Sequence, residues 1–411
     1  MKTSLCLLLG LLAAAPALAT NYYVDSSTGS PSNPGTQAAP FQNIDQLFGL
    51  TLQPGDNVYF ARGGTYGGVT YPNYLEITAN GTATQPITFT SYGSGNLPAF
   101  INPGEYYVIR LAGDYLVLDG VVIHNTTWSG AEIKGDHDVI QNCEIYDCGW
   151  GINIADASNA RVTGNHIHNL NMIQNDTASD NDFGAVGINI GTLNGADIGW
   201  NDIHDCIAAS HDYGLDGGAF EIYGNVSNAD IHHNLVHDNN GVFETGGGAA
   251  SNIKIYYNLC VHNRELGGFH LTGTFVGTLS NFKFENNTVV ETVAADNYDD
   301  MIWFDGTNTM NQFSMKNNIF YFDGFNAFTN QSGFTHEYNI YYAPNSAPLG
   351  FTLTSTELVA NPQFVNLSGG NYHLTSTSPA VNAGASLGYT HDRDANSITN
   401  TPDIGCFEST Y

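Results

Sequence analysis

Residues 159–170 read NARVTGNHIHNL, and residues 195–206, GADIGWNDIHDC, repeat the same pattern. Four more copies follow: NADIHHNLVHDN at 228–239, NIKIYYNLCVHN at 252–263, NFKFENNTVVET at 281–292 and QFSMKNNIFYFD at 312–323. Each copy consists of two short segments of period two, which is the period of a β-strand, around a central Asn. A unit that recurs in this way is typical of a solenoid.

The central asparagines align along the chain with spacings of 21 to 36 residues, and the shortest spacing matches one turn of a parallel β-helix. The aligned positions are Asn165, Asn201, Asn234, Asn258, Asn287, Asn318 and Asn339, with Val121 and Cys143 in the same place in earlier coils. Stacked Asn side chains can hydrogen-bond one another and the backbone of neighbouring coils. We therefore predict an all-β solenoid of roughly ten coils, in which this ladder is structural.

A second column lies three residues after the ladder. It consists of aromatic side chains: His124, Tyr146, His168, His204 and His237. Histidines that recur at one repeat position are expected to form a stacked outer face rather than a set of metal ligands.

The first residues, Met1 to Thr3, precede an apolar run from Leu5 to Leu12 and an A-x-A end at Ala19. This order predicts a secretory signal peptide over residues 1–19 and an extracellular protein. No later stretch approaches the ~18 apolar residues of a membrane helix. Glycosylation sequons occur at Asn80, Asn125, Asn175, Asn225, Asn286, Asn330 and Asn366.

Five cysteines follow the leader, an odd number that leaves at least one thiol unpaired or pairs it between chains. They are Cys143, Cys148, Cys206, Cys260 and Cys406. The 10 basic residues against 39 acidic ones give a net charge of −29. Such a surface repels nucleic acids and anionic membranes, and it disfavours a polyanionic glycan unless cations intervene.

The two ends of the chain resemble those of a known group. NYYVDSSTGSPSNPGTQAAPFQNIDQL at 21–47 and LQPGDNVYFARGGTYGG at 52–68 are similar to the N-terminal segment of secreted right-handed parallel β-helix proteins of the pectate-lyase-like superfamily. NPQFVNLSGGNYHLTSTSPAVNAGA at 361–385 and PDIGCFE at 402–408 resemble the tail that closes them. The resemblance implies a right-handed helix and an extracellular polysaccharide substrate, and it leaves the reaction open.

On this basis we expect a capping segment and first coils over residues 20–105, central coils over 106–345, and a C-terminal coil and tail over 346–411. The stretch QNIDQLFGL from residue 42 is expected to be a short helix that covers the open end of the solenoid.

Another strand precedes the ladder in each coil, and its outward middle position is polar. The positions are Glu132, Asn153, Asn189, Glu221, Glu244 and His270. Rungs of a parallel sheet lie ~4.8 Å apart, so we expect Glu221 and Glu244 to be neighbours. Because two close carboxylates repel, the pKa of one should rise, which suits general acid catalysis.

Five residues upstream we expect a second polar column of Asp216, Asn239 and Glu265, with the loops 170–184 and 207–217 as one wall of a groove. The two glycines after Asp216 allow a tight turn that brings its carboxylate over the strands. The candidate catalytic residues are Asp216, Glu221, Glu244 and His270. Substrate contacts are expected from Asn189, Tyr213, Tyr223, Glu265, Trp303 and Asp305, with Phe269 as a further stacking surface.

These residues favour a monomeric glycoside hydrolase that needs no cofactor and acts on a neutral or weakly charged cell-wall glycan. Glu221 with Glu244 suits retention of configuration, and Asp216 with Glu244 suits inversion. One alternative is a Ca²⁺-dependent polyuronate lyase or epimerase with its base among Lys134, Lys254, Arg264 and His270. The other is a non-catalytic glycan-binding solenoid, and the two glutamates could instead hold a structural Ca²⁺.

Overall fold

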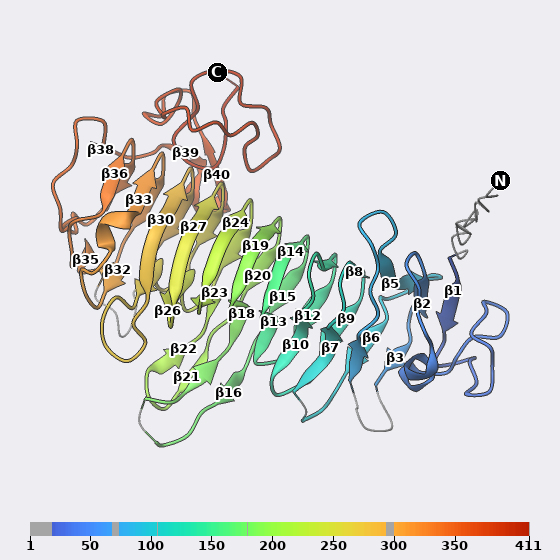
Figure 1. Ribbon diagram of the computed structural model, residues 1–411. Helices are drawn as coiled ribbons and strands as arrows, with labels where there is room; N and C mark the ends of the chain where they lie inside the picture. Colours follow the sequence, from blue (N-terminus) through green and yellow to red (C-terminus); the bar gives the residue numbers. More distant parts are fainter. Residues whose placement is uncertain (1–18, 68–73, 105, 179, 293–299, 411) are drawn as a thin grey trace, which may run out of the picture.

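The computed structural model describes residues 19–67, 74–104, 106–178, 180–292 and 300–410, and these form the predicted parallel β-helix (Figure 1). Each complete coil contributes one strand to each of three parallel sheets. Sheet 1 has the order β1 (Asn21–Val24), β2 (Asn57–Ala61), β5 (Ile87–Tyr92), β8 (Leu116–Asp119), β11 (Val139–Gln141), β14 (Ala157–Thr163), β19 (Leu193–Gly199), β24 (Val226–His232), β27 (Ala249–Tyr256), β30 (Thr278–Glu285), β33 (Phe313–Lys316) and β36 (Thr335–Glu337).

Sheet 2 precedes sheet 1 in each coil, and sheet 3 follows it. Sheet 2 contains β4 (Leu75–Ile77), β7 (Tyr107–Leu111), β10 (Ser129–Ile133), β13 (Trp150–Ile154), β18 (Val186–Ile190), β23 (Gly218–Tyr223), β26 (Phe243–Gly246), β29 (Gly267–Phe269), β32 (Asp300–Phe304) and β35 (Ala327–Thr329). Sheet 3 contains β3 (Thr65–Tyr66), β6 (Ala99–Ile101), β9 (Val122–His124), β12 (Glu144–Tyr146), β15 (His166–His168), β20 (Asp202–His204), β25 (Leu235–His237), β28 (Leu259–Val261), β31 (Thr288–Glu291), β34 (Ile319–Phe322), β37 (Ile340–Tyr342) and β38 (Leu358–Val359).

The interior is filled by columns of apolar side chains, one from each rung. In sheet 2 the inward column changes from Ile188 to Phe220 and Phe243 on successive rungs, all of them buried. Phe269 belongs to this interior: it is fully buried and stacks on Phe304 at 4.7 Å between ring centroids. Its expected role as a sugar-stacking surface is therefore wrong, because alternation along the strand turns it inward.

The Asn ladder is confirmed. Asn201 shows the pattern: its Oδ1 accepts from the backbone N and the Nδ2 of Asn165, both at 3.0 Å, and its Nδ2 donates to the Val162 carbonyl at 3.0 Å. The ladder ends where Asn339 donates to Glu357 Oε1 at 2.9 Å. Each amide thus links its own coil to both neighbours, which satisfies buried backbone groups at the turn.

A second amide ladder replaces the expected column through Asn239. The side chain of Asn239 is buried, accepts from Cys206 N at 2.9 Å and donates to Asn263 Oδ1 at 2.9 Å. Asn263 in turn donates to Glu291 Oε1 at 2.9 Å. Asn239 is therefore a structural turn residue and does not belong to the candidate site with Asp216 and Glu265.

The aromatic column on the outside of sheet 3 is stacked as predicted. The ring centroids of His124 and Tyr146 lie 4.8 Å apart, those of Tyr146 and His168 5.3 Å, and those of His204 and His237 4.6 Å. His168 and His204 stack at 5.1 Å with an interplanar angle of 5°.

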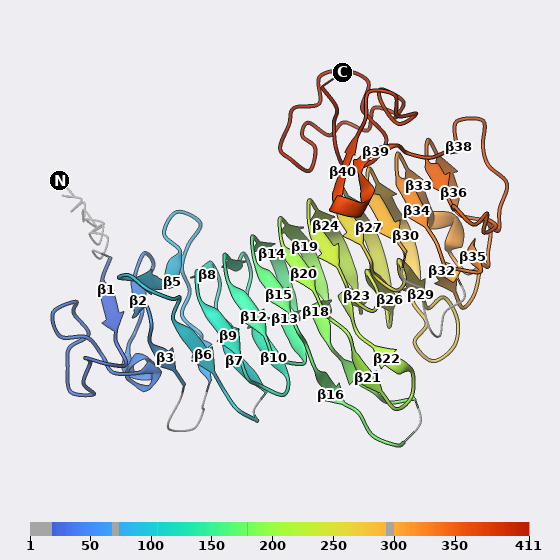
Figure 2. The same cartoon turned by 180° about the vertical axis from the view of Figure 1, so that it is seen from behind.

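The expected N-terminal helix is a 3₁₀ helix, η1 (Ile44–Gly49), with a capping box between Asn43 and Gln46. Its Ile44 and Leu47 are buried in the main core. At the other end, the hairpin of β39 (Phe364–Asn366) and β40 (Asn371–Leu374) lies beside the solenoid (Figure 2) and packs on sheet 3, where Tyr372 joins a core cluster with Leu259 and Val290. Two further 3₁₀ helices are η2 (Met310–Gln312) and η3 (Leu367–Gly369).

Residues 1–18 of the predicted signal peptide lie outside the described residues. In the part that is described, no helix is long and apolar enough to cross a membrane. The five cysteines after the leader are free and buried. Six sequon asparagines are exposed, but Asn286 is buried and its Nδ2 donates to the Asp403 carbonyl at 3.3 Å, so this sequon is closed to glycosylation in the folded chain.

Candidate active site

Two antiparallel hairpins project from the coils beside sheet 2 (Figure 1). They are β16 (Met172–Gln174) with β17 (Phe183–Gly184), and β21 (Ala208–Ser210) with β22 (Gly214–Asp216). Asp182 ties them together, because its Oδ2 accepts from His211 N at 2.7 Å and from Ser210 Oγ at 2.8 Å. Asp212 Oδ2 accepts from Asn181 N at 2.8 Å in return. The two longest loops before this region therefore form one braced wall.

A pocket of about 670 Å³ lies between this wall and the outer face of sheet 2. Its lining includes every predicted site residue except Glu265 and the buried Phe269: Asn189, Tyr213, Asp216, Glu221, Tyr223, Glu244, His270, Trp303 and Asp305. Sequence reasoning missed the other lining residues, Trp150, Asp180, Asp182, Phe183, Thr272, Thr274 and Phe275. Several of these belong to the loops and hairpins, where no repeat register marks them; Trp150 begins a repeat strand.

Glu221 and Glu244 occupy directly opposed positions of β23 and β26, as the repeat predicted. Asn189 of β18 lies opposite Glu221 on the other side. The next rung departs from the prediction: Glu244 is opposite Gly268, and His270 lies two residues further along the chain.

Glycine at 268 makes room for an aromatic ring. A Cβ at this position would lie 2.1 Å from Cζ2 of Trp303, which is the residue opposite Gly268 on β32. The indole Nε1 donates to Glu265 Oε2 at 2.9 Å. Glu265 does not line the pocket itself, but it accepts a hydrogen bond from Trp303, which does.

Glu244 is held by two side chains. His270 Nε2 lies 2.7 Å from Glu244 Oε1, and the Tyr223 hydroxyl donates to the same oxygen at 3.2 Å. On the other side of the imidazole, His270 Nδ1 lies 3.2 Å from Asp305 Oδ2. Burial lowers the pKa of His270, but its hydrogen bonds to Glu244 and Asp305 and their charges outweigh burial and raise the pKa on balance. The raised pKa favours the imidazolium form of His270, and its Nε2 lies within hydrogen-bond distance of Glu244.

Three carboxyl groups in and below the pocket have raised pKa values. Burial, followed by the charges of Glu244 and Asp216, raises the pKa of Glu221 well above its ordinary value. Burial raises the pKa of Asp216 to about 7 and that of Glu265 to about 8, with the charge of Glu244 adding to both shifts. The site thus combines carboxyl groups of raised pKa with Glu244, which is held by hydrogen bonds from His270 and Tyr223.

Glu132, the first residue of the polar column, belongs to a separate network. Arg110 Nε lies 2.6 Å from Glu132 Oε2, and Asn153 Nδ2 donates to Glu132 Oε1 at 3.0 Å. Asn189 Nδ2 donates to Asn153 Oδ1 at 2.8 Å, so amides connect this ion pair to the edge of the pocket.

Of the four residues considered as the base of a lyase, His270 lines the pocket, and the two lysines and Arg264 lie elsewhere. Lys134 pairs with Asp156 at 3.3 Å, and Lys254 on sheet 1 pairs with Asp230 at 3.3 Å. Neither they nor Arg264 line the pocket, and among the described lining residues there is no Lys or Arg. The one set of three clustered metal-ligating side chains in the described ranges is Glu144, His166 and His168, which lies outside the pocket. Calcium at the pocket carboxylates stays a prediction.

The fold defines the class: this is a right-handed parallel β-helix, as predicted. Residues 107–289 match the family model described as the right handed beta helix region. No curated protein sequence matches the chain.

Solved structures share the fold at low sequence identity. Pectate lyase Pel9A superposes with a TM-score of 0.62 and 17% identity over 95% of this chain and 97% of that one. XylC in complex with xylose superposes with a TM-score of 0.58 and 11% identity, over 94% of this chain and 98% of XylC. The GH136 lacto-N-biosidase of Eubacterium ramulus superposes with a TM-score of 0.56 and 14% identity over 80% of this chain. The match spans only 65% of that protein. Both a lyase and a glycoside hydrolase are represented, so the fold leaves the reaction open.

Proposed function

We propose that this protein is an extracellular glycoside hydrolase that cleaves a neutral or weakly charged polysaccharide, with Glu221 as general acid and Glu244 as nucleophile. The observation that carries the proposal is the direct opposition of Glu221 and Glu244 on neighbouring rungs inside the pocket. Hydrolysis of a glycosidic bond needs two carboxyl groups in unlike protonation states.

The surroundings assign the roles. Burial and the charge of Glu244 keep the proton on Glu221, which suits it to protonate the glycosidic oxygen as the bond to the anomeric carbon breaks. Glu244, held by His270, attacks that carbon as a carboxylate and forms a glycosyl ester. The Glu221 carboxylate then takes a proton from water, whose oxygen displaces Glu244 and releases the sugar.

The rung spacing favours retention of configuration. Opposed positions on adjacent parallel strands lie ~4.8 Å apart, close to the ~5–5.5 Å carboxyl separation of retaining enzymes and short of the ~6.5–9.5 Å of inverting ones. Asp216 is the proton-bearing group that an inverting pair with Glu244 would use.

The lining supports an uncharged substrate. Trp150, Phe183 and Tyr213 give the pocket an aromatic lining that suits contact with sugar faces, and no Lys or Arg among the described lining residues is present to neutralise a uronate. The net charge of −29 points in the same direction.

The test is a polysaccharide panel with products analysed by mass spectrometry. We expect a gain of 18 Da per cleavage. NMR of the earliest products should show the same anomeric configuration as the substrate, as retention requires. Glu221→Gln and Glu244→Gln should each lower kcat at least ~100-fold, whereas the matched change Glu337→Gln, on the outer face of sheet 1, should not.

Three results would overturn parts of the proposal. Products that absorb near 235 nm without the mass gain would indicate elimination. Unchanged rates in both glutamine variants would rule out a catalytic role for Glu221 and Glu244. Binding without product from any glycan would indicate a non-catalytic solenoid.

A further inference from the structure

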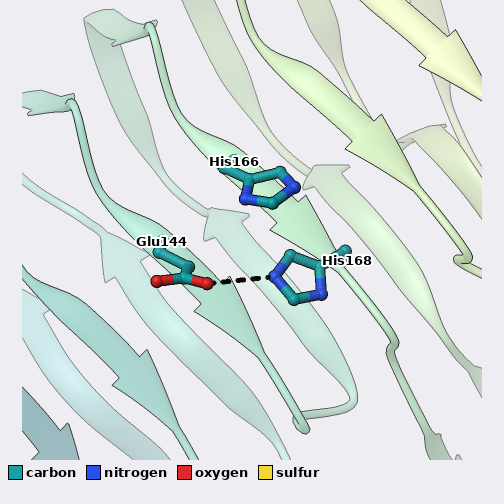
Figure 3. Close-up of side chains that lie close together, drawn as sticks. All are labelled: Glu144, His166 and His168. Atoms are coloured by element: carbon teal, nitrogen blue, oxygen red, sulfur yellow. Dashed lines mark hydrogen bonds and ion pairs between the residues drawn. The ribbon is translucent and has the colours of Figure 1, made fainter.

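A cluster of ligating side chains lies on the outer face of sheet 3, on coils that also build the pocket but on another sheet. Glu144 of β12 is directly opposite His166 of β15, and His168 follows two residues later on the same face. One ligand atom from each lies within 4.8 Å of the others, and Figure 3 shows the carboxylate and both rings facing a common space.

Hydrogen bonds fix which nitrogen of His168 faces this space. His168 Nδ1 lies 2.7 Å from Asn169 Oδ1, a contact in which the ring nitrogen donates because an amide oxygen only accepts. The lone pair of a neutral His168 is therefore on Nε2, and this atom lies 3.4 Å from Glu144 Oε1.

A relay of two groups fixes His166 in the same way. His204 Nδ1 lies 2.7 Å from Asp205 Oδ2, so it donates its proton there and keeps Nε2 as an acceptor. His166 Nε2, 2.8 Å from His204 Nε2, is then the donor, which leaves the His166 lone pair on Nδ1. Histidine ligands of metals are oriented by such carboxylate partners on the opposite nitrogen.

We propose that Glu144, His166 and His168 bind a divalent transition metal, with Zn²⁺ as the representative ion and water in the remaining position. Two imidazoles and one carboxylate are a zinc ligand set, whereas Ca²⁺ and Mg²⁺ select oxygen ligands. Bonds of ~2.0–2.2 Å require the three ligand atoms to approach one another by small side-chain rotations. Solvent reaches the site, since the Glu144 side chain is 41% exposed and that of His168 14%.

The bound ion would link the consecutive coils of β12 and β15, with β20 supplying His204 behind them. Because metal that binds only the folded state stabilises it, this site would act as a clamp in the middle of the solenoid. The proposal is independent of the glycosidase activity, since none of these residues lines the pocket.

The test uses the chelator-treated, metal-free full chain titrated with Zn²⁺ by isothermal calorimetry, and with Co²⁺ by visible absorption. We expect one saturable site, tetrahedral Co²⁺ bands, and no comparable binding of Ca²⁺ or Mg²⁺. His168→Asn and the near-isosteric Glu144→Gln should each weaken Zn²⁺ binding at least ~10-fold, and Asp205→Asn should weaken it by a similar factor through His204.

The matched control is His124→Asn, which alters the same aromatic column one coil before the cluster and should leave Zn²⁺ affinity unchanged. Circular dichroism of each metal-free variant checks the fold. Absence of a saturable Zn²⁺ site, equal binding of Ca²⁺, or equal losses in the control and the ligand variants would overturn the proposal.

Discussion

Asn234 offers a quantitative test of the ladder, because its side chain is fully buried and all of its hydrogen bonds are internal. Its Oδ1 accepts from the backbone N and the Nδ2 of Asn201 at 2.9 and 3.0 Å. Its Nδ2 donates to the Ile198 carbonyl at 3.0 Å and to Asn258 Oδ1 at 2.9 Å. The perturbation is Asn234→Ala, which removes all four hydrogen bonds and leaves the Asn201 N–H and the Ile198 carbonyl of the preceding turn without this partner.

The expected loss follows from that list. A buried hydrogen bond contributes ~1 kcal/mol net, so four of them give ~4 kcal/mol, and desolvated orphan groups push the loss upward rather than downward. This is a large part of the ~5–15 kcal/mol that stabilises a typical domain. The control is Asn194→Ala, an exposed Asn of β19 that accepts from Ser227 Oγ and Asn228 Nδ2, for which we expect a loss below ~1 kcal/mol.

Both losses are measured by equilibrium urea unfolding followed by far-UV circular dichroism and by Trp fluorescence. Coincident curves from the two probes are needed, since solenoids can unfold in segments. If Asn234→Ala shifts the unfolding free energy no more than Asn194→Ala does, the ladder does not stabilise the coils and the reasoning from hydrogen-bond satisfaction is refuted.

Three further predictions concern the pocket. Gly268→Ala should displace the Trp303 ring, costing ~1–3 kcal/mol of stability and altering Trp fluorescence; an unchanged emission spectrum would contradict it. Asp305→Asn should lower the pKa of His270, measured by NMR titration, because one of the charges that raise this pKa is lost. The same change should lower kcat more than it changes KM. An unchanged titration of His270 would count against the Asp305–His270 contact. The raised pKa of Glu265, about 8 against an ordinary 4.5, makes its contribution to stability full below pH 4.5 and lost as the pH rises toward 8. Glu265→Gln should flatten this decline in unfolding free energy, and parallel pH curves for the two proteins would disprove the assignment.

The sequence by itself determined the solenoid, the Asn ladder and the Glu221/Glu244 pair. The reason is that a parallel β-helix places the same repeat position of successive coils side by side, so a one-dimensional alignment becomes a spatial one. Where the repeat is regular, as from β18 to β26, the predicted neighbours are the observed ones.

The sequence also named most of the other lining residues, but only the tertiary structure decided how they are arranged and which further residues join them. His270 lies two residues beyond the rung position that the repeat assigned to it, and a slip of two residues keeps every side chain on its own face, so alternation along the strand does not reveal it. Asn239 looked like part of the polar column, but the turn places it in a second buried ladder. Asp180 and Phe183 enter the pocket on hairpins whose path is set by contacts such as those of Asp182 with the neighbouring hairpin. Contacts between segments that share no repeat are fixed by packing and hydrogen bonding in the folded chain, and no local pattern encodes them.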